Sequence, residues 1–162
     1  MKTQRRIDYL VKSLHLLPHP EGGFYRETYR SSETLNTEYG SRNLATSIYF
    51  LLTSADVSRF HRIKSDELWF FHEGSALTIH LLNDTGHQEL RLGLPYENEE
   101  QLPYQLVKAN TIFGSTIDSQ DSYALVSCVV SPGFDFNDFE LFDKETLLEK
   151  YPEAIQIISR LT

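Results

Sequence analysis

The sequence has only one cysteine, Cys128, among its 162 residues, so no disulfide can form within the chain. It has no long hydrophobic segment either, since the apolar run from Ile48 to Leu52 is far shorter than the ~20 residues that span a bilayer. Lys and Arg are scattered along the chain and the net charge is −8, which leaves no basic stripe for binding phosphates. These absences argue against nucleic-acid and membrane partners and favour a cytoplasmic protein.

What the sequence does contain is typical of one globular domain covering residues 1–162. Hydrophobic residues make up 40% of the chain and charged residues 23%, an ordinary globular mixture. Aromatic residues reach 12%, which favours β structure. Cys128 lies in an apolar run, so we expect a small buried side chain rather than a nucleophile.

The hydrophobic pattern divides the chain into a helix, a series of strands and a short helical end. Ile7, Leu10, Val11 and Leu14 have helical spacing, which predicts a helix over 3–14 with Thr3 as its N-cap. A barrel is expected over about 24–142, followed by a helical segment over 143–161 that begins at the N-cap Asp143. The predicted strands are 24–31, 43–52, 67–72, 76–82, 87–92, 104–108 and 123–130, with a hairpin turn over 83–86 and a solvated acidic loop over 97–101.

The most informative segment is His61 to Gly74, which resembles the first motif of the cupin superfamily. That motif is His, any residue, His, three or four residues, Glu, six residues and Gly. His61, Glu67 and Gly74 match it, whereas Ile63 stands where the second His would be. The resemblance implies an all-β cupin double-stranded β-helix, a jelly-roll barrel with an N-terminal helix and short C-terminal helices.

The resemblance also bears on metal binding. Metal-dependent cupins usually hold their ion with three His and one Glu, and Phe113 occupies the position of the His in the second motif. Only His61 and Glu67 remain as weak candidate ligands, whereas even an open catalytic zinc site keeps three protein ligands. We therefore predict no cofactor, with a divalent metal as the less favoured alternative.

Without a metal, the residues of this segment are those of an organic-ligand pocket. Strand alternation gives Glu67, Trp69 and Phe71 the same face, so aromatic walls would surround the candidate catalytic residues His61 and Glu67. Further candidate ligand-binding residues are Tyr25, Glu27, Tyr49, Phe113 and Tyr123. The alternative is structural: His61 is simply hydrogen-bonded, and Glu67 pairs with Arg59 or Arg62.

A second informative segment is 18–31, where a turn leads into a strand. The consecutive Gly22 and Gly23 after Glu21 indicate a backbone conformation or close approach that a Cβ would block. Alternation would place Tyr25, Glu27 and Tyr29 on one face of the strand and Arg26 and Arg30 on the other. One face would then meet a ligand, unless the strand is an edge or dimer-contact strand.

Segments 20–28, 46–52, 61–74 and 131–136 together resemble one cupin subfamily of unknown function, over roughly residues 7 to 142. This resemblance implies a homodimer. A more distant likeness is to sugar-nucleotide 3,5-epimerases, whose early Gly-Phe-Phe-x-Glu element is similar to Gly23 to Glu27. It implies that His61 acts as a base. The resemblance does not place the acid partner, for which Tyr123 and Tyr49 are the candidates.

Four functions follow from these observations. The first is binding of a small polar organic molecule in the barrel mouth, with or without catalysis. The second is a metal-independent epimerase or isomerase in which His61 removes a proton and Glu67 orients the imidazole. The third is a metal-dependent oxygenase or isomerase, and the fourth is a structural assembly module with a barrel packed solid.

Overall fold

The computed structural model describes residues 2–96 and 98–162, so Glu97 of the acidic loop lies outside the described residues. The chain begins with helix α1, Lys2–Ser13, whose Ile7 and Leu10 are buried against the sheet. Thr3 lies inside this helix and is therefore not its N-cap. In the loop at 98–101, Glu99 and Glu100 are exposed as expected, but Gln101 is buried. No helix in the described parts of the chain is long and apolar enough to cross a membrane.

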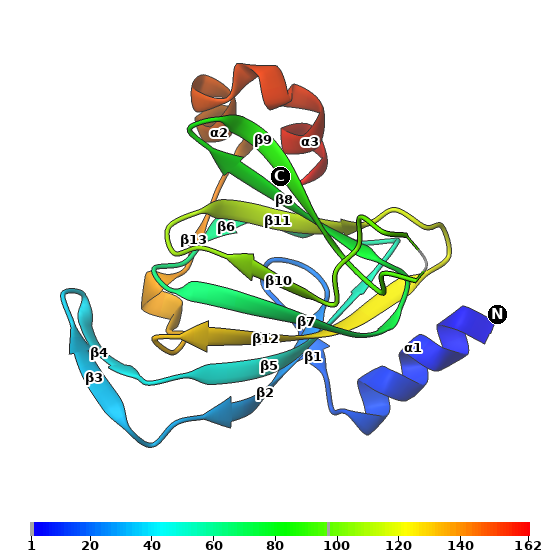
Figure 1. Ribbon diagram of the computed structural model, residues 1–162, viewed down its shortest axis with the longest axis horizontal. Helices are drawn as coiled ribbons and strands as arrows, with labels where there is room; N and C mark the ends of the chain where they lie inside the picture. Colours follow the sequence, from blue (N-terminus) through cyan, green and yellow to red (C-terminus); the bar gives the residue numbers. More distant parts are fainter. Residues whose placement is uncertain (1, 97) are drawn as a thin grey trace.

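Two antiparallel sheets face each other and enclose the core (Figure 1). The first has the order β1-β2-β5-β12-β7-β10, and the second has the order β13-β6-β11-β8-β9. The first sheet consists of β1 (Leu17–Pro18), β2 (Phe24–Arg30), β5 (Thr46–Thr53), β12 (Tyr123–Ser131), β7 (Asp66–Gly74) and β10 (Tyr104–Val107). The second consists of β13 (Glu140–Leu141), β6 (Ser58–Arg62), β11 (Ile112–Ile117), β8 (Leu77–Asn83) and β9 (Gly86–Leu92). A separate hairpin of β3 (Thr34–Thr37) and β4 (Gly40–Asn43) projects from the barrel (Figure 1).

Side chains from both sheets fill the deep part of the barrel. Phe50 from β5, Trp69 from β7, Ile79 from β8 and Phe113 from β11 are all nearly inaccessible to solvent. Burial of such apolar side chains is the main favourable contribution to folding. These side chains form the packed core beneath the cavity described below.

The C-terminal segment packs against the outside of the second sheet. It comprises α2 (Lys144–Lys150), a 3-10 turn η2 (Pro152–Ala154) and α3 (Ile155–Arg160). Asp143 caps α2 as predicted, because its carboxylate accepts a hydrogen bond from the Thr146 N–H at 2.8 Å. The Leu161 carbonyl accepts a bond from the Phe60 N–H at 2.9 Å, which ties the end of the segment to β6.

The hairpin predicted at 83–86 is present between β8 and β9, but β6 and β11 were not predicted. β6 is a run of polar residues around one Phe, and β11 contains Gly114, Ser115 and Thr116. All of β11 is buried, since it lies centrally between β6 and β8 and is covered on both faces. Such a strand lacks the polar and apolar alternation by which a half-buried strand is detected.

Candidate active site

A cavity of about 550 Å³ opens at the end of the barrel that the core leaves free. Its floor contains four buried side chains that can ionise or react: Glu21, His61, Glu67 and Cys128. Aromatic and aliphatic residues form its walls, and charged residues lie at its rim. The remaining lining residues are Leu17, His19, Tyr25, Arg26, Glu27, Arg30, Thr46, Ile48, Ile63, Val130, Phe134, Asp135, Phe136 and Phe139.

Glu21 reaches the floor because of the turn between β1 and β2. Gly22 has a φ of +113°, and a Cβ there would lie 1.9 Å from the Val57 carbonyl oxygen. Gly23, with a φ of +73°, donates its N–H to the Asp56 carboxylate at 2.8 Å. The prediction of a backbone approach that excludes a Cβ is confirmed, and this close approach seats the Glu21 carboxylate beside β6.

His61 uses both of its ring nitrogens in contacts with the protein. Nδ1 lies 2.7 Å from the Arg59 carbonyl oxygen and must donate to it, since a carbonyl only accepts. Nε2 lies 2.9 Å from Glu21 Oε2. The ring packs against Phe113 and Phe139, with centroid separations of 4.2 and 5.3 Å. The imidazole is therefore fixed in both position and orientation.

The contact between His61 and Glu21 is an ion pair. Burial opposes the charge on each group, but the mutual attraction and hydrogen bond are stronger. They raise the pKa of His61 above its ordinary value and lower the pKa of Glu21. His61 is thus an imidazolium with both N–H groups engaged, and neither ring nitrogen is free to accept a proton.

Glu67 lies in the same cavity, and no Lys or Arg among the described residues forms an ion pair with it. It comes from β7, where it is paired in register with Val130 of β12 and Val107 of β10. Burial, and next the negative charge of Glu21, raise its pKa to about 7, and His61 only partly offsets this. The same burial and the two carboxylates raise the pKa of the Cys128 thiol, which is therefore protonated at neutral pH.

His19 adds a neutral imidazole to the wall next to Glu21. Its Nδ1 accepts a hydrogen bond from the Glu21 N–H at 3.2 Å, and its ring meets Tyr25 edge to face at 4.5 Å. Burial lowers its pKa, so it carries no charge at neutral pH. The nearby contact of its Nδ1 with Glu21 Oε2, at 3.8 Å, is therefore not an ion pair.

Four of the residues predicted for the site line this cavity: His61, Glu67, Tyr25 and Glu27. Arg30 also lines it, contrary to the simple alternation along β2. The register of β2 against β5 shifts between Glu27 and Tyr29, and this bulge turns Arg30 to the cavity side. Arg30 donates two hydrogen bonds to the Glu27 carboxylate, at 2.9 and 2.8 Å.

The other predicted residues lie elsewhere. Trp69, Phe71 and Phe113 share the inward face but pack in or against the core below the cavity. Tyr49 and Tyr123 are on the outer face of the first sheet, where Tyr49 packs near His72 and Tyr123 donates to Glu73 at 2.7 Å. Neither tyrosine can serve as an acid inside the barrel.

The alternative pairing of Glu67 with an arginine is also wrong. Arg62 binds the Glu140 carboxylate, and Arg59 donates to the Pro20 carbonyl. Sequence reasoning likewise missed Glu21, although the two glycines after it marked the turn that places it. The role of orienting His61, which the sequence hypothesis gave to Glu67, belongs to Glu21.

The metal set of three His and one Glu does not fit this cavity. Ile63 and Phe113 stand at two of the expected His positions, and Phe113 covers one face of the His61 ring. His61 Nε2 is engaged by Glu21 rather than aimed at a shared point with Glu67. We therefore derive no step through a metal at this site.

A second hollow of about 610 Å³ lies between α1 and the loops near Ser54 and Asp121. Its titratable side chains, Asp8, Lys12 and Asp121, are all exposed. Exposed charges of this kind keep ordinary solvation and form no specialised chemical environment. The barrel cavity is therefore the better candidate site, despite the similar size of the two.

The fold and this cavity define a cupin. Residues 8–142 match the family model described as Cupin superfamily (DUF985), and the chain belongs to that family. The recognition and fold predictions made from His61 to Gly74 are thus confirmed.

Several relatives support this assignment. Uncharacterized protein YML079W of Saccharomyces cerevisiae is 29% identical over 88% of this chain and 78% of its own length. Protein SO0799 from Shewanella oneidensis is 44% identical with a TM-score of 0.88, over 96% of both chains. A hypothetical protein from Leishmania major is 37% identical with a TM-score of 0.88, over 96% of this chain and 97% of that one. An oxalate decarboxylase of Bacillus subtilis, at 14% identity and a TM-score of 0.57, shares the fold.

Proposed function

We propose that this cupin binds a small polar organic molecule in the barrel cavity and moves a proton on it, as an isomerase or epimerase does. The observation that carries the proposal is a buried carboxyl group, Glu67, whose pKa is raised to about 7 inside a cavity of about 550 Å³. A general acid or base works best when its pKa lies near the working pH. Structural carboxylates are normally ionised at neutral pH, so this environment favours catalysis over a purely structural role.

The proposal gives the proton-transfer role to Glu67 rather than to His61. Both N–H groups of His61 are used by Glu21 and the Arg59 carbonyl, so its ring has no lone pair for a substrate proton. Glu67 in its ionised form could remove a proton next to a carbonyl, and in its neutral form could return one. The His61–Glu21 pair would act as a positioning element whose charges set the pKa of Glu67.

The walls support a small ligand with both polar and apolar parts. Tyr25, Phe134, Phe136 and Phe139 offer aromatic faces, and Glu27 and Arg30 offer polar groups near the mouth. Mostly apolar walls with a few polar groups are typical of sites for organic ligands. The same composition supports ligand binding even where no proton transfer follows.

Binding can be tested first by a thermal-shift screen of sugar nucleotides, keto acids and nucleotides. A compound that fits the cavity is expected to raise the melting temperature of the wild-type protein, because it binds only the folded state. Tyr25→Ala should reduce the shift by removing a wall, whereas Glu38→Gln, on the exposed turn of the projecting hairpin, should leave it unchanged. A screen without any stabilising compound would argue against these ligand classes.

Proton transfer is tested by following deuterium uptake from heavy water into each compound that binds. We expect uptake with the wild type and with Glu38→Gln, and a loss of about 10²-fold or more with Glu67→Gln. Uptake that survives Glu67→Gln but disappears in His61→Gln would return the base role to His61. Uptake unaffected by both substitutions would refute the proposed chemistry while leaving ligand binding intact.

A further inference from the structure

Three potential metal ligands gather on the outer face of the second sheet, away from the barrel cavity. They are His80 on β8 and His87 and Glu89 on β9, all from one hairpin. His80 is paired across the strands with Glu89, and His87 is opposite the neighbouring outward residue Leu82. The side chains that alternate with His80, namely Ile79 and Leu81, belong to the barrel core. The hairpin thus directs this trio toward the C-terminal helices.

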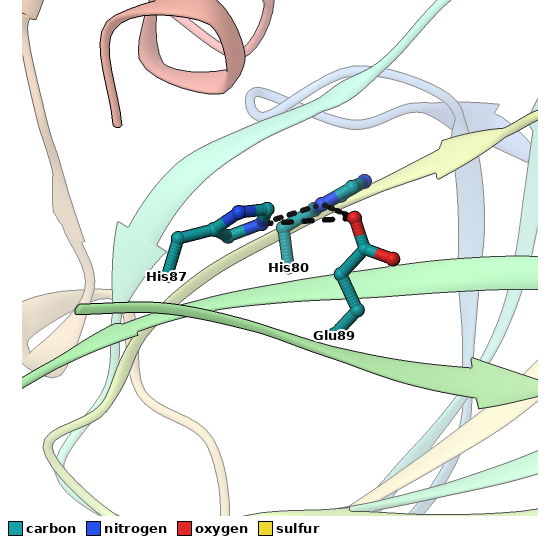
Figure 2. Close-up of side chains that lie close together, drawn as sticks. All are labelled: His80, His87 and Glu89. Carbon is teal, nitrogen blue, oxygen red and sulfur yellow. Dashed lines mark hydrogen bonds and ion pairs between the residues drawn. The ribbon is translucent and has the colours of Figure 1, made fainter. Parts of the chain in front are cut away.

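The ligand atoms of the trio converge on one another (Figure 2). His80 Nδ1 lies 3.0 Å from His87 Nε2 and 3.7 Å from Glu89 Oε1. His87 Nε2 lies 4.0 Å from Glu89 Oε1. Donor atoms around a tetrahedral zinc ion at ordinary bond lengths are about 3.3 Å apart. Small rotations of the partly exposed His87 and the exposed Glu89 side chains are enough to reach that spacing.

His80 is held in the orientation and tautomer that a metal ligand needs. Its Nε2 lies 2.9 Å from Thr116 Oγ1, and the Thr116 hydroxyl donates to Asp118 Oδ1 at 3.2 Å. The hydroxyl has only one proton, so Nε2 must donate and Nδ1 must carry the lone pair. The Thr78 hydroxyl donates to Asp118 Oδ2 at 2.9 Å and fixes that carboxylate in turn. Support of this kind behind an imidazole is the usual arrangement at protein metal sites.

The third ligand and the open side of the site are set by the surroundings of Glu89. Arg91 approaches Glu89 Oε2 at 3.9 Å, which leaves Oε1 facing the two imidazoles. The trio opens on a hollow of about 420 Å³, so a water molecule or a small ligand can reach a fourth position.

We propose that His80, His87 and Glu89 bind a divalent transition-metal ion of the zinc type, with the fourth coordination position open to the hollow beneath the C-terminal helices. Two imidazoles and one carboxylate suit Zn²⁺ and its neighbours in the first transition row, whereas Ca²⁺ and Mg²⁺ prefer oxygen ligands. The site is independent of the barrel cavity and of the function proposed for it. Its open position resembles the ligand arrangement of catalytic rather than structural zinc sites.

The test is isothermal titration of chelator-treated protein with Zn²⁺ alone. We expect one Zn²⁺ per chain, with affinity reduced more than about tenfold in His87→Ala and in Glu89→Gln. Thr116→Val should weaken binding by about tenfold, because the valine keeps the shape but removes the hydroxyl that orients His80. Co²⁺ as a second probe should give the visible spectrum of a tetrahedral ion, and His87→Ala should abolish it.

Two other histidines provide matched controls. His15 and His72 are exposed and lie outside this hollow, so His15→Asn and His72→Asn should bind Zn²⁺ like the wild type. Because the His87 side chain is partly exposed and Glu89 is exposed, their variants should fold normally, which circular dichroism would verify. No binding by the folded wild type would overturn the proposal, and so would equal binding by wild type, His87→Ala and Glu89→Gln.

Discussion

At the scale of single residues, the site depends on the charges of three buried groups, namely the carboxyl groups of Glu21 and Glu67 and the imidazole of His61. Glu21 and His61 form an ion pair, and Glu67 remains beside them in a place where ionisation is costly. A like charge and burial act in the same direction on a carboxyl pKa. Because its pKa is raised to about 7, Glu67 changes its protonation within the physiological pH range.

The raised pKa of Glu67 makes stability depend on pH. The folded-state pKa of about 7 exceeds the ordinary 4.5, so the carboxyl ionises first in unfolded chains as pH rises. Below pH 4.5 Glu67 is protonated in both states and does not destabilise the fold. As the pH rises from 4.5 through about 7, the free energy of unfolding falls by about 3 kcal/mol in total. Glu67→Gln should therefore gain about 2 to 3 kcal/mol relative to wild type between pH 5 and pH 8, as measured by urea unfolding.

The matched control for this measurement is Glu38→Gln, which replaces an exposed carboxyl group. Its difference from wild type should be nearly independent of pH over the same range. A similar pH-independent difference for Glu67→Gln would mean that Glu67 has an ordinary pKa in the folded protein. The basis for assigning it proton transfer would then be lost.

The sequence predicted some of the residues of this site but not all of them. The motif spacing identified His61 and Glu67, which both line the cavity. It could not identify Glu21, because the contact joins residues that are 40 positions apart and depends on a turn geometry that no local pattern encodes. The direct hydrogen bond to His61 was therefore assigned to the wrong carboxylate.

At the scale of elements, the turn at Gly22 controls the placement of Glu21. Gly22→Ala would put a Cβ 1.9 Å from the Val57 carbonyl oxygen, in a backbone conformation that already disfavours side chains. We expect a loss of about 2 kcal/mol or more in the free energy of unfolding. Ligand-induced thermal shifts should fall as well, since the neighbouring Glu21 must move.

Gly86→Ala is the control that separates the effect of the steric clash with Val57 from the effect of a positive φ. Gly86 has a φ of +96°, close to that of Gly22, but the nearest atom to a Cβ there is a flexible side-chain oxygen of Glu153 at 3.5 Å. Its cost should be about 1 kcal/mol, from the backbone conformation alone. Equal losses for the two variants would contradict the role assigned to the Val57 contact.

Most of the incorrect predictions at this scale assigned a side chain to the wrong face of its strand. In β5, residues 48–52 are apolar on both faces, because the core covers one side and α1 the other. Alternation therefore gave no sign that Tyr49 points outward. The bulge in β2 likewise reversed the expected face of Arg30, and bulges leave little trace in a sequence.

At the scale of the whole molecule, the first sheet has an open edge. β2 pairs with β5 along its length, but on its other side β1 covers only Phe24 and Tyr25 within the described residues. Residues 26–30 are exposed there, including Tyr29, at 56% exposure. An open strand edge can be covered by another chain, and dimerisation remains our expectation for this protein.

Light scattering coupled to size exclusion at micromolar concentration would measure the assembly. We expect a mass about twice the 18.8 kDa of the chain, and a shift toward the monomer in Tyr29→Lys. The control is Ile155→Lys, which changes a residue of comparable exposure, 53%, on α3. A monomeric wild type would contradict the expectation, and a dimer insensitive to Tyr29→Lys would place the interface elsewhere.

The tie between β6 and the far end of the chain has a consequence for biosynthesis. The strand that carries His61 is flanked by β11 and β13, and its Phe60 N–H is bound by the Leu161 carbonyl, about 100 residues further on. A ribosome-bound fragment that ends before these segments holds β6 without its flanking strands and without the Leu161 carbonyl. Although Glu21 and Arg59 are already synthesised by then, the cavity around His61 can be completed only when translation has almost finished.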